Sequence, residues 1–296
     1  MKYRRTVGGT IFTVANYTVM ILFAVVCLLP IWHTLCSSFS MPYDLSRHSG
    51  LVLWPVGGVT TQGYSLVLNN KSLWTGYLNT LINVTLGTSL GVLLTFTAAY
   101  VLSRKNLLFG TFLIFMIMFT MWFDGGLIPR YMVVRKLGML DTRAALILPA
   151  AMSTFNFIIM RTALSEVPDG LVESATIDGA GHLTIMFRIV MPVTKATIAV
   201  IALYYAVGIW NSWFAANIYL ISARHLRPLQ LVLRDILINA DTNSINVPSD
   251  ASSAADLYRP LVQYTTIVIA TVPILAVYPF IQKYFVTGVM LGSIKG

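Results

Sequence analysis

Residues 173–192 read ESATIDGAGHLTIMFRIVMP and lie in the longest charged interruption between the apolar segments of the chain. The first half of this stretch predicts a short helix over 171–177. Four carboxylates surround that helix: Glu166, Asp169, Glu173 and Asp178. Gly179 and Gly181 are expected to end it, because glycine adopts backbone angles that other residues avoid. Pro192 begins the next apolar run, where its missing N–H costs little. The stretch therefore predicts a helix and a turn between two apolar segments.

The composition around this stretch is that of an integral membrane protein. The chain has 296 residues, of which 56% are hydrophobic and only 10% are charged, whereas soluble domains carry about 25% charged residues. Cys27 and Cys36 give no disulfide framework, and with four scattered histidines they predict no metal site. The net charge of +9 suits a protein beside anionic lipid and requires no nucleic acid.

The apolar segments are long enough to cross a bilayer, which takes about 20 residues per helix. Continuous apolarity without sustained alternation favours helices. We expect an all-α membrane protein with one transmembrane domain over 1–296. Its six predicted spans cover about 10–34, 72–103, 106–124, 143–161, 192–221 and 260–284. The first span follows Lys2, Arg4 and Arg5 as in a signal peptide, but no small-residue cleavage site follows it, so we expect it to be retained.

The distribution of basic residues bears on the orientation of these spans. Ten of the twenty Lys and Arg residues fall on each side, so the raw count is a tie. Short loops near span ends carry more weight, and the N-terminal tail and the turn at 103–106 both favour an inside N-terminus. We therefore predict cytoplasmic N- and C-termini and a cytoplasmic loop over 162–191.

Three segments are then expected outside. Residues 37–71 are predicted to be irregular rather than a domain. In 124–143, the spacing of Leu127, Tyr131, Val134 and Leu137 predicts a short amphipathic helix at the outer surface. In 222–259, the tract 239–255 has the composition of a mobile loop.

No sequence motif for catalysis occurs in the chain. A G-x-x-x-x-G-K-[ST] phosphate loop is absent, as are HExxH, GxSxG and CxxC. We therefore expect no enzyme and no catalytic residue here, and any ATP-driven activity must borrow its ATPase. The interiors of the spans also lack Asp and Glu, which disfavours an ion-coupled secondary carrier. That alternative stays open because backbone carbonyls can bind ions.

Polar and aromatic residues inside the spans are candidates for a substrate path. They are Asn79, Asn83, Asn156, Tyr204, Trp210, Asn211 and Trp213. Asparagine in lipid is costly unless it faces protein or water. Aromatic faces stack on sugar rings and amides bond sugar hydroxyls, so one interpretation is a sugar-lined path. The other is hydrogen bonding between helices together with an interfacial aromatic belt.

The spacing within 173–192 resembles the signature cytoplasmic loop of ATP-driven (ABC) importer permeases, the EAA motif. That signature runs Glu-Ala-Ala, three residues, Gly, nine residues, Ile, one residue, Leu-Pro. Five residues match: Glu173, Ala175, Gly179, Ile189 and Pro192. Ser174 replaces the first alanine of the signature and Met191 replaces the leucine, both with mild changes of size. The alternative is an ordinary solvated helix and turn.

The resemblance implies a role for this loop as a coupling helix that docks on a separate ATPase subunit. The residues so implicated are Glu173, Ser174, Ala175, Asp178, Gly179, Ala180, Gly181, Ile189 and Pro192. The tail 285–296 is similar to that of carbohydrate permeases, in particular the second maltose permease subunit, although a frayed terminus is the alternative. The phrases at 123–129 and 233–237 look like those of permeases for larger oligosaccharides, including alginate.

The resemblance further implies a MetI-like fold in a bacterial cytoplasmic (inner) membrane. The implied partners are a second, homologous permease subunit, two ATPase subunits that hold ATP and Mg²⁺, an extracytoplasmic binding protein, a sugar and membrane lipid. The chain itself is expected to hold no cofactor and no metal. A scaffold or signalling protein that does not transport is a further alternative. The basic residues of the outer segments have two interpretations. They either pair with nearby aspartates or bind an acidic patch on the binding protein, or they attract an anionic oligosaccharide.

Overall fold

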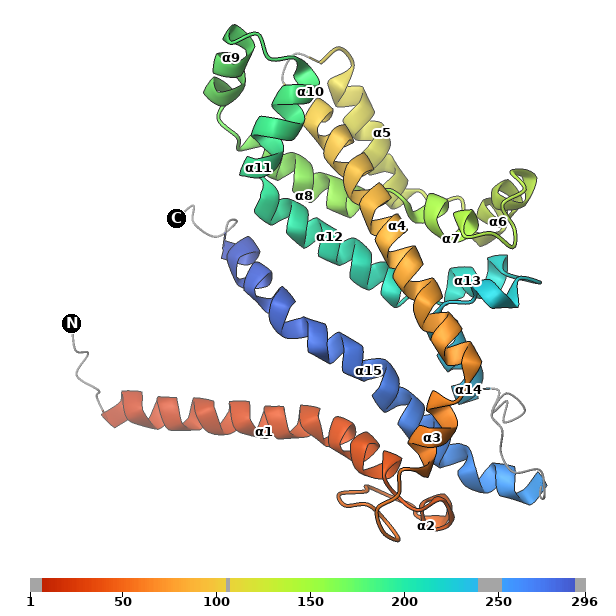
Figure 1. The fold of residues 1–296 in the computed structure, drawn as a ribbon. Helices are drawn as coiled ribbons and strands as arrows, with labels where there is room; N and C mark the ends of the chain where they lie inside the picture. Colours follow the sequence, from red (N-terminus) through yellow and green to blue (C-terminus); the bar gives the residue numbers. More distant parts are fainter. Residues whose placement is uncertain (1–6, 105–106, 239–251, 291–296) are drawn as a thin grey trace. The chain divides into compact units, whose positions relative to one another are not determined.

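The computed structural model describes residues 7–104, 107–238 and 252–290 (Figure 1). The described residues are helical or lie in the turns and loops between helices, and no strand occurs among them. The all-α prediction is therefore confirmed for this part of the chain. The C-terminal end of the tail and most of the tract at 239–255 lie outside the described residues.

The chain forms two compact units, which are described separately. The smaller unit comprises 1–71 and 235–274, and the larger unit comprises 72–234 and 275–296.

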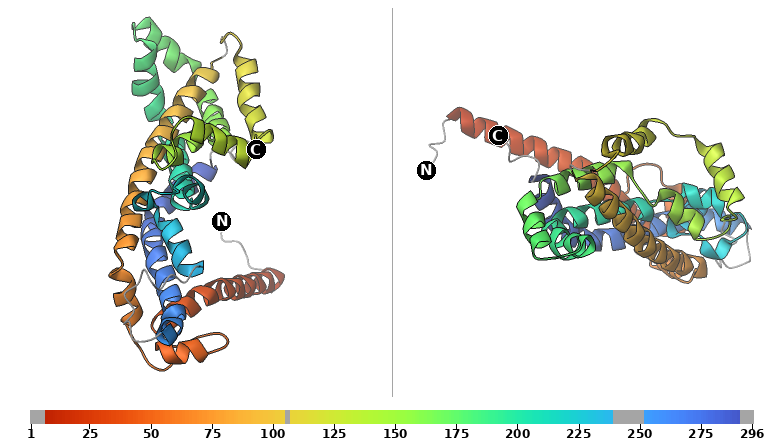
Figure 2. Two further views of the ribbon diagram at one scale, coloured as in Figure 1. Left: turned by 90° about the vertical axis from the view of Figure 1, so that its right-hand side faces the viewer. Right: turned by 90° about the horizontal axis from the view of Figure 1, so that it is seen from above.

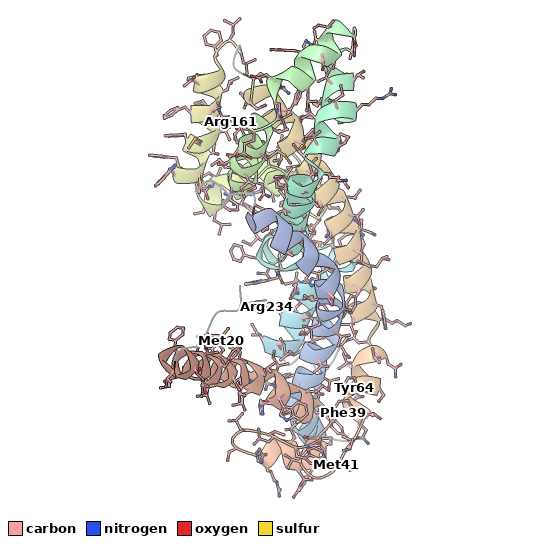
Figure 3. All side chains as sticks on the ribbon, turned by 90° about the vertical axis from the view of Figure 1, so that its left-hand side faces the viewer. Met20, Phe39, Met41, Tyr64, Arg161 and Arg234 are labelled. Carbon is pink, nitrogen blue, oxygen red and sulfur yellow. The ribbon has the colours of Figure 1, made fainter. Side chains whose placement is uncertain are left out.

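The smaller unit contains α1 (Val7–Ser38), α2 (Pro42–Arg47), α3 (Gln62–Leu68) and the first part of α15 (Ser252–Met290). Residues 37–71 were expected to be irregular, but they include the two short helices α2 and α3. The ring of Phe39, just after α1, lies 4.9 Å from the ring of Tyr64 on α3 (Figure 3). His33 joins α1 to its neighbours, because its Nδ1 accepts from the N–H of Val52 and its ring meets the edge of Tyr264. In α1 only the last three residues are buried.

The larger unit is built on the long helix α4 (Lys71–Leu102), which lies beside α8 and α12 (Figures 1 and 2). Its other elements are α5 (Gly110–Trp122), α6 (Leu127–Lys136), α7 (Ala144–Ile147), η1 (Leu148–Ala150), α8 (Thr154–Ser165), α9 (Asp169–Ile177), α10 (His182–Thr184), η2 (Ile185–Val190), α11 (Met191–Val193), α12 (Lys195–Trp210), α13 (Phe214–Tyr219), η3 (Arg224–Leu226) and α14 (Leu229–Ile238), which crosses the boundary between the units.

The core of the larger unit joins α4, α8 and α12 to the segment around η2. Phe96, Phe157, Met160, Ile185 and Ile201 are among its fully buried side chains. Gly91 lets α4 approach α12 closely, because a Cβ there would come within 3.0 Å of the Tyr205 ring. The core therefore joins the segment that follows α9 directly to the apolar helices.

Several apolar segments are broken rather than straight. The helices α1, α4 and residues Leu257–Ala276 of α15 are each long and apolar enough to cross a membrane. Three bent pairs pass the same test together: α5 with α6 at 114°, α7–η1 with α8 at 50°, and α10–α11 with α12 at 85°. The described residues therefore hold three to six candidate spans, by length and composition.

The sharpest bend, before α6, has a local cause. Gly126 has a φ of +83°, and its N–H donates to the carboxylate of Asp124. Arg130 closes the first turns of α6 by donating to both oxygens of the same carboxylate at 2.8 Å. The glycine turn thus directs α6 away from α5.

Candidate functional site

The helix α9 ends in a turn that requires Gly179. Its N–H donates to Thr176 O at 3.0 Å, and the N–H of Ala180 donates to Ala175 O at 2.9 Å. This pair of bonds is a Schellman motif, in which the residue after the helix takes left-handed angles. Gly179 has a φ of +79°, which explains glycine at this place.

Gly181 has a different role from the one the sequence predicts. Its φ of −71° and ψ of 158° are extended angles that any residue adopts. The residue precedes α10, and its carbonyl accepts the N–H of Ile185. The prediction that two glycines break the helix is therefore wrong for Gly181, because Gly179 alone supplies the left-handed turn.

One face of α9 is anchored in the core and the rest is exposed. Ala175 is buried in the core cluster that also contains Leu164, Val167 and Ile185. Glu173 and Ser174 are exposed, and the Ile177 side chain is 85% exposed. Together with Leu183, which is 70% exposed, Ile177 gives this end of the larger unit an apolar surface beside carboxylates. We call Glu173, Ile177 and Leu183 the α9 surface.

The segment after α10 changes its winding before Pro192. Residues Ile185–Val190 form a π-helix, in which the N–H of Met191 bonds to Met186 O. Pro192 is exposed, and Ile189 packs against the core. Thr194 then bonds to Val190 O through both its N–H and its hydroxyl, and the chain turns by 85° into α12. A π-helical turn and a proline are both recognised causes of bends in helices. The segment η2 is packed in one core with residues of α8 and α12.

A second cluster lies on α4, where Asn79 and Asn83 share one face. Arg143, just before α7, donates from Nη2 to Asn79 Oδ1 at 2.6 Å and from Nη1 to Asn83 Oδ1 at 3.3 Å. Asn79 Nδ2 in turn donates to His225 O at 2.7 Å and to Arg227 O at 3.0 Å. We call Arg143, Asn79 and Asn83 the arginine–amide network.

Asp141 fastens the adjoining loop. It accepts the N–H groups of Ser222 at 2.7 Å and Ala223 at 2.9 Å. The hydrogen bond from Ala223, with others from Ser222 and Ile221, lowers the pKa of the Asp141 carboxyl, against an opposing effect of burial. On the far side of the loop, the Thr80 hydroxyl accepts the N–H of Leu229 at 2.9 Å. Side chains of α4 and the 141–143 turn thus satisfy the backbone of this loop.

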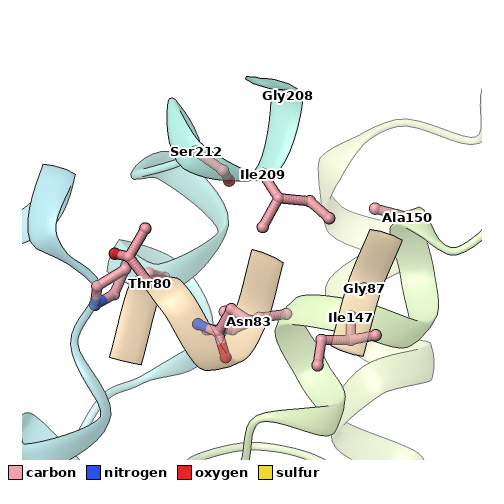
Figure 4. Close-up of a pocket in the computed structure, with 11 residues that line it drawn as sticks. Thr80, Asn83, Gly87, Ile147, Ala150, Gly208, Ile209 and Ser212 are labelled. Atoms are coloured by element: carbon pink, nitrogen blue, oxygen red, sulfur yellow. The ribbon is translucent and has the colours of Figure 1, made fainter. Parts of the chain in front are cut away.

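A cavity of about 110 Å³ adjoins the arginine–amide network (Figure 4). Its walls come from α4, α7, η1, α12 and α13, and its lining includes Thr80, Asn83, Ile147, Ile209 and Ser212. The Asn83 Nδ2 group and the Ser212 hydroxyl have no hydrogen-bond partner among the described residues. The cavity therefore combines an apolar wall with free polar groups, which suits a ligand rich in hydroxyls.

The other candidate path residues are dispersed. Asn156 is buried near the start of α8. The ring of Tyr204 lies 6.1 Å from that of Phe155. The Asn211 amide bonds to the carbonyl of Val207 within its own chain segment. None of these three residues lines the cavity.

Trp210 and Trp213 each adjoin a lining residue in the sequence, as Asn211 does. The Trp210 ring lies 6.5 Å from Tyr77, and its buried Nε1 has no acceptor among the described residues. The guanidinium of Arg234 lies 4.5 Å from the Trp213 ring centroid. Sequence reasoning thus grouped seven residues, of which the structure brings Asn79 and Asn83 together.

Two participants were missed from the sequence. Arg143 is one of several basic residues in the predicted outer segments, although two asparagines one turn apart indicate a need for a shared donor. Tyr205 was passed over beside Tyr204. Its hydroxyl lies 2.6 Å from Thr95 Oγ1 and accepts the N–H of Ser153 at 2.9 Å. It therefore joins α4, α12 and the start of α8 at one buried point.

The chain is similar to known transport proteins over nearly its whole length. Residues 85–290 match the family described as binding-protein-dependent transport system inner membrane component. The polygalacturonan/rhamnogalacturonan transport system permease protein YtcP of Bacillus subtilis (strain 168) is 36% identical over 286 residues, which cover 97% of this chain and 99% of the relative. Protein LplC of the same strain is 36% identical over 291 residues, which cover 98% and 97% of the two chains.

A solved structure has the same fold. It is described as the crystal structure of a bacterial ABC transporter involved in the import of the acidic polysaccharide alginate. One of its chains matches with a TM-score of 0.84 at 29% identity, covering 95% of this chain and 98% of that one. The expected MetI-like permease fold and the resemblance to carbohydrate permeases are therefore confirmed. The chain belongs to the family of binding-protein-dependent transport system inner membrane components, and it is a permease of the ABC transporter type.

Proposed function

We propose that this chain is the permease subunit of an ATP-driven importer of oligosaccharides, acidic ones among them. The relatives whose names mention polygalacturonan, rhamnogalacturonan and alginate support this substrate class. The complex contains a second, homologous permease, two ATPase subunits that bind ATP and Mg²⁺, and an extracytoplasmic binding protein. It lies in the bacterial cytoplasmic membrane, with both termini and the loop at 162–191 inside.

The observation that carries the coupling part of the proposal is the way α9 is held. Its end is fixed by the Schellman turn at Gly179, and Ala175 anchors it in the core shared with α8 and α12. The α9 surface points away from that core. An ATPase subunit that grips this surface can therefore move α9 and the helices behind it as a rigid lever when its own dimer closes.

The coupling residues fall into three groups. Glu173, Ser174 and Asp178 supply exposed polar contacts, whereas Ala175, Ala180 and Ile189 pack inward. Gly179 and Pro192 shape the backbone around them, and Gly181 is the extended residue before α10. This chain does no covalent chemistry and contains no phosphate-loop sequence, so hydrolysis of ATP takes place on the partner.

The substrate path is the less constrained part. We place the cavity lined by Asn83 on the substrate path. Asn79 shares the arginine–amide network with Asn83, and Trp210 follows the lining residue Ile209 in the sequence. The dispersed positions of Asn156, Tyr204, Asn211 and Trp213 are equally compatible with packing between helices. We therefore propose that the substrate contacts the residues that line the cavity rather than the dispersed ones.

Uptake into proteoliposomes tests the proposal. The complete importer is reconstituted with its binding protein, and labelled oligosaccharide uptake is measured with ATP and Mg²⁺ at the ATPase face. We expect uptake that requires ATP and persists when proton and sodium gradients are collapsed. Uptake that follows an ion gradient without ATP would establish the secondary-carrier alternative instead.

A further inference from the structure

We propose that the arginine–amide network is a subsite for the carboxylate of an acidic sugar residue, which makes Arg143 a specificity-determining residue. The inference rests on the proposed function and deepens it, because it assigns recognition of charge to this chain. It starts from the arrangement of Arg143, Asn79 and Asn83 beside the cavity.

The positive charge of Arg143 is not matched by a carboxylate among the described residues. Its two hydrogen-bond acceptors are the neutral amide oxygens of Asn79 and Asn83. Asp141, two residues earlier, is engaged by the backbone N–H groups of Ser222 and Ala223. A partly buried charge is costly unless it is paired. The network therefore holds a guanidinium whose charge is available to an anionic ligand.

The network is also rigid. Asn79 and Asn83 are 2% and 3% exposed, and Asn79 is fixed from its other end by the carbonyls of His225 and Arg227. An arginine has five N–H donors in a fixed plane, and two of them form hydrogen bonds here. Amide dipoles that point their oxygens at the guanidinium hold it in place without neutralising it. Such pre-organised charge is what recognises a carboxylate with little loss of entropy.

The cavity gives the ligand a place beside Asn83, which accepts a hydrogen bond from Arg143, although Arg143 itself is not among the lining residues. Asn83 belongs to both the network and the cavity lining, and Leu146 and Ile147 line the cavity one turn after Arg143 (Figure 4). Its volume of about 110 Å³ equals that of about three to four water molecules in the liquid. This is room for a carboxylate and part of a sugar ring.

The free groups in the lining match the rest of an acidic sugar. Asn83 Nδ2 donates to a carboxylate oxygen, and the Ser212 hydroxyl bonds a ring hydroxyl. Ile147 and Ile209 supply an apolar wall for the carbon face of the ring. A neutral sugar would gain the last two contacts without the charge-assisted ones.

Equilibrium binding tests the inference directly. The purified complex is prepared without its binding protein, so that the binding protein's own preference does not enter. A labelled trigalacturonate is competed with unlabelled trigalacturonate or with its fully methyl-esterified, neutral form. We expect wild type to prefer the acid by about tenfold, the equivalent of 1.4 kcal/mol, and the preference to weaken as salt is raised.

Three variants separate a subsite from a structural role. Arg143→Gln should abolish the acid preference while neutral-ester binding stays within about twofold, and Arg143→Lys should keep part of the preference because it keeps the charge. Arg135→Gln, an exposed charge on α6, is the matched control and should leave the preference intact. Assembly of each complex is checked by gel filtration.

Several results would overturn the inference. They are an acid preference that survives in Arg143→Gln, an equal loss of both ligands in Arg143→Gln and Arg143→Lys, an equal effect of Arg135→Gln, or no preference in wild type. ATP-driven uptake is measured in the same preparation. Charge-selective binding that depends on Arg143 but occurs without ATP-driven uptake would uphold the subsite and contradict the proposed function.

Discussion

At the scale of single residues, Gly179 is the position where backbone geometry and coupling meet. A Cβ there would meet no atom within 4 Å, so the penalty for substitution comes from its φ of +79° alone. Left-handed angles cost a residue with a Cβ about 1–2 kcal/mol, and a β-branched residue more. We expect Gly179→Val to insert and assemble normally but to lose most ATP-driven uptake, because the end of α9 is reshaped.

Gly181→Val is the control for this prediction. Gly181 also has open space around it, but its extended angles accept valine without strain. Uptake and substrate-stimulated ATPase activity are measured for both variants. Normal coupling in Gly179→Val, or equal damage from Gly181→Val, would show that the turn is not what matters.

The lowered pKa of Asp141 gives a second prediction at this scale. A depressed carboxyl pKa stabilises the folded state above the unfolded value, about 3.9 for Asp, and that contribution is lost as pH falls through the folded value. Asp141→Asn keeps an oxygen acceptor and tolerates the φ of +59°, but it removes the charge. The wild type should therefore be more stable than this variant at pH 6.

Thermal unfolding of the purified protein in detergent between pH 6 and 3 measures the effect. The difference in melting temperature between wild type and Asp141→Asn should shrink as pH falls below about 4. A difference that is constant across this range would mean that the carboxylate charge does not hold the Ser222–Ala223 backbone.

Residues also show why part of the site could not be predicted. Arg143 lies two positions from Asp141, which suggests a local ion pair or a solvated charge. In the structure the carboxylate goes to backbone N–H groups 81 and 82 residues away, and the guanidinium goes to amides 60 and 64 residues away. Such partners are chosen by tertiary packing, which no local pattern contains. Asn79 and Asn83 could be identified because their spacing is itself the signal.

At the scale of helices, the Tyr205 hydroxyl connects three helices through two hydrogen bonds. Its hydroxyl satisfies the Ser153 N–H at the break before α8 and also bonds to Thr95 on α4. Tyr205→Phe leaves that N–H without an acceptor, and we expect a loss of about 1–2 kcal/mol of stability. The loss should appear as a lower melting temperature in detergent.

Tyr131→Phe is the matched change. The Tyr131 ring stacks on Tyr219, and its hydroxyl has no hydrogen-bond partner among the described residues. Its melting temperature should stay near that of wild type. If Tyr205→Phe is equally silent, the hydroxyl does not hold the broken segment together.

Helices, like single residues, can be predicted where the local sequence determines them and not where tertiary packing does. The helix α4 could be predicted because 72–103 is a charge-free run without proline, and α9 because carboxylates and a glycine bound it. The breaks at 151–153 and at Thr194 could not. They depend on Tyr205 meeting Ser153 from a distant helix and on a π-helical segment whose winding is set by the core. Local propensity predicts where a helix can form, whereas packing decides where it bends.

At the scale of the whole molecule, the proposed topology predicts which helices are accessible from each side of the membrane. Ile128 on α6 and Ile177 on α9 are 72% and 85% exposed, and the proposed topology places them on opposite sides of the membrane. Each is replaced by cysteine in a variant that lacks Cys27 and Cys36. A membrane-impermeant maleimide should label Ile128→Cys in intact spheroplasts, and Ile177→Cys only after permeabilisation.

Native Cys36 is buried and Cys27 exposed, so their removal prevents background labelling at α1. The reverse pattern of labelling would invert the orientation and with it the proposed side of ATPase docking. Addition of the binding protein extends the measurement, since it should protect Ile128→Cys and other positions in 37–71, 124–143 and 222–259. Protection confined to 161–195 would contradict the proposed outer face.

The turn that ends α9 has a consequence for how such permeases diverge. Its geometry is fixed by main-chain hydrogen bonds, one glycine and the buried Ala175, none of which belongs to the α9 surface. Substitutions at Glu173, Ile177 or Leu183 can therefore accumulate without altering the direction in which the chain leaves the helix. Recognition of an ATPase subunit and transmission of its movement then depend on different residues. A related permease can therefore change the ATPase that it binds while it keeps the turn at the end of α9.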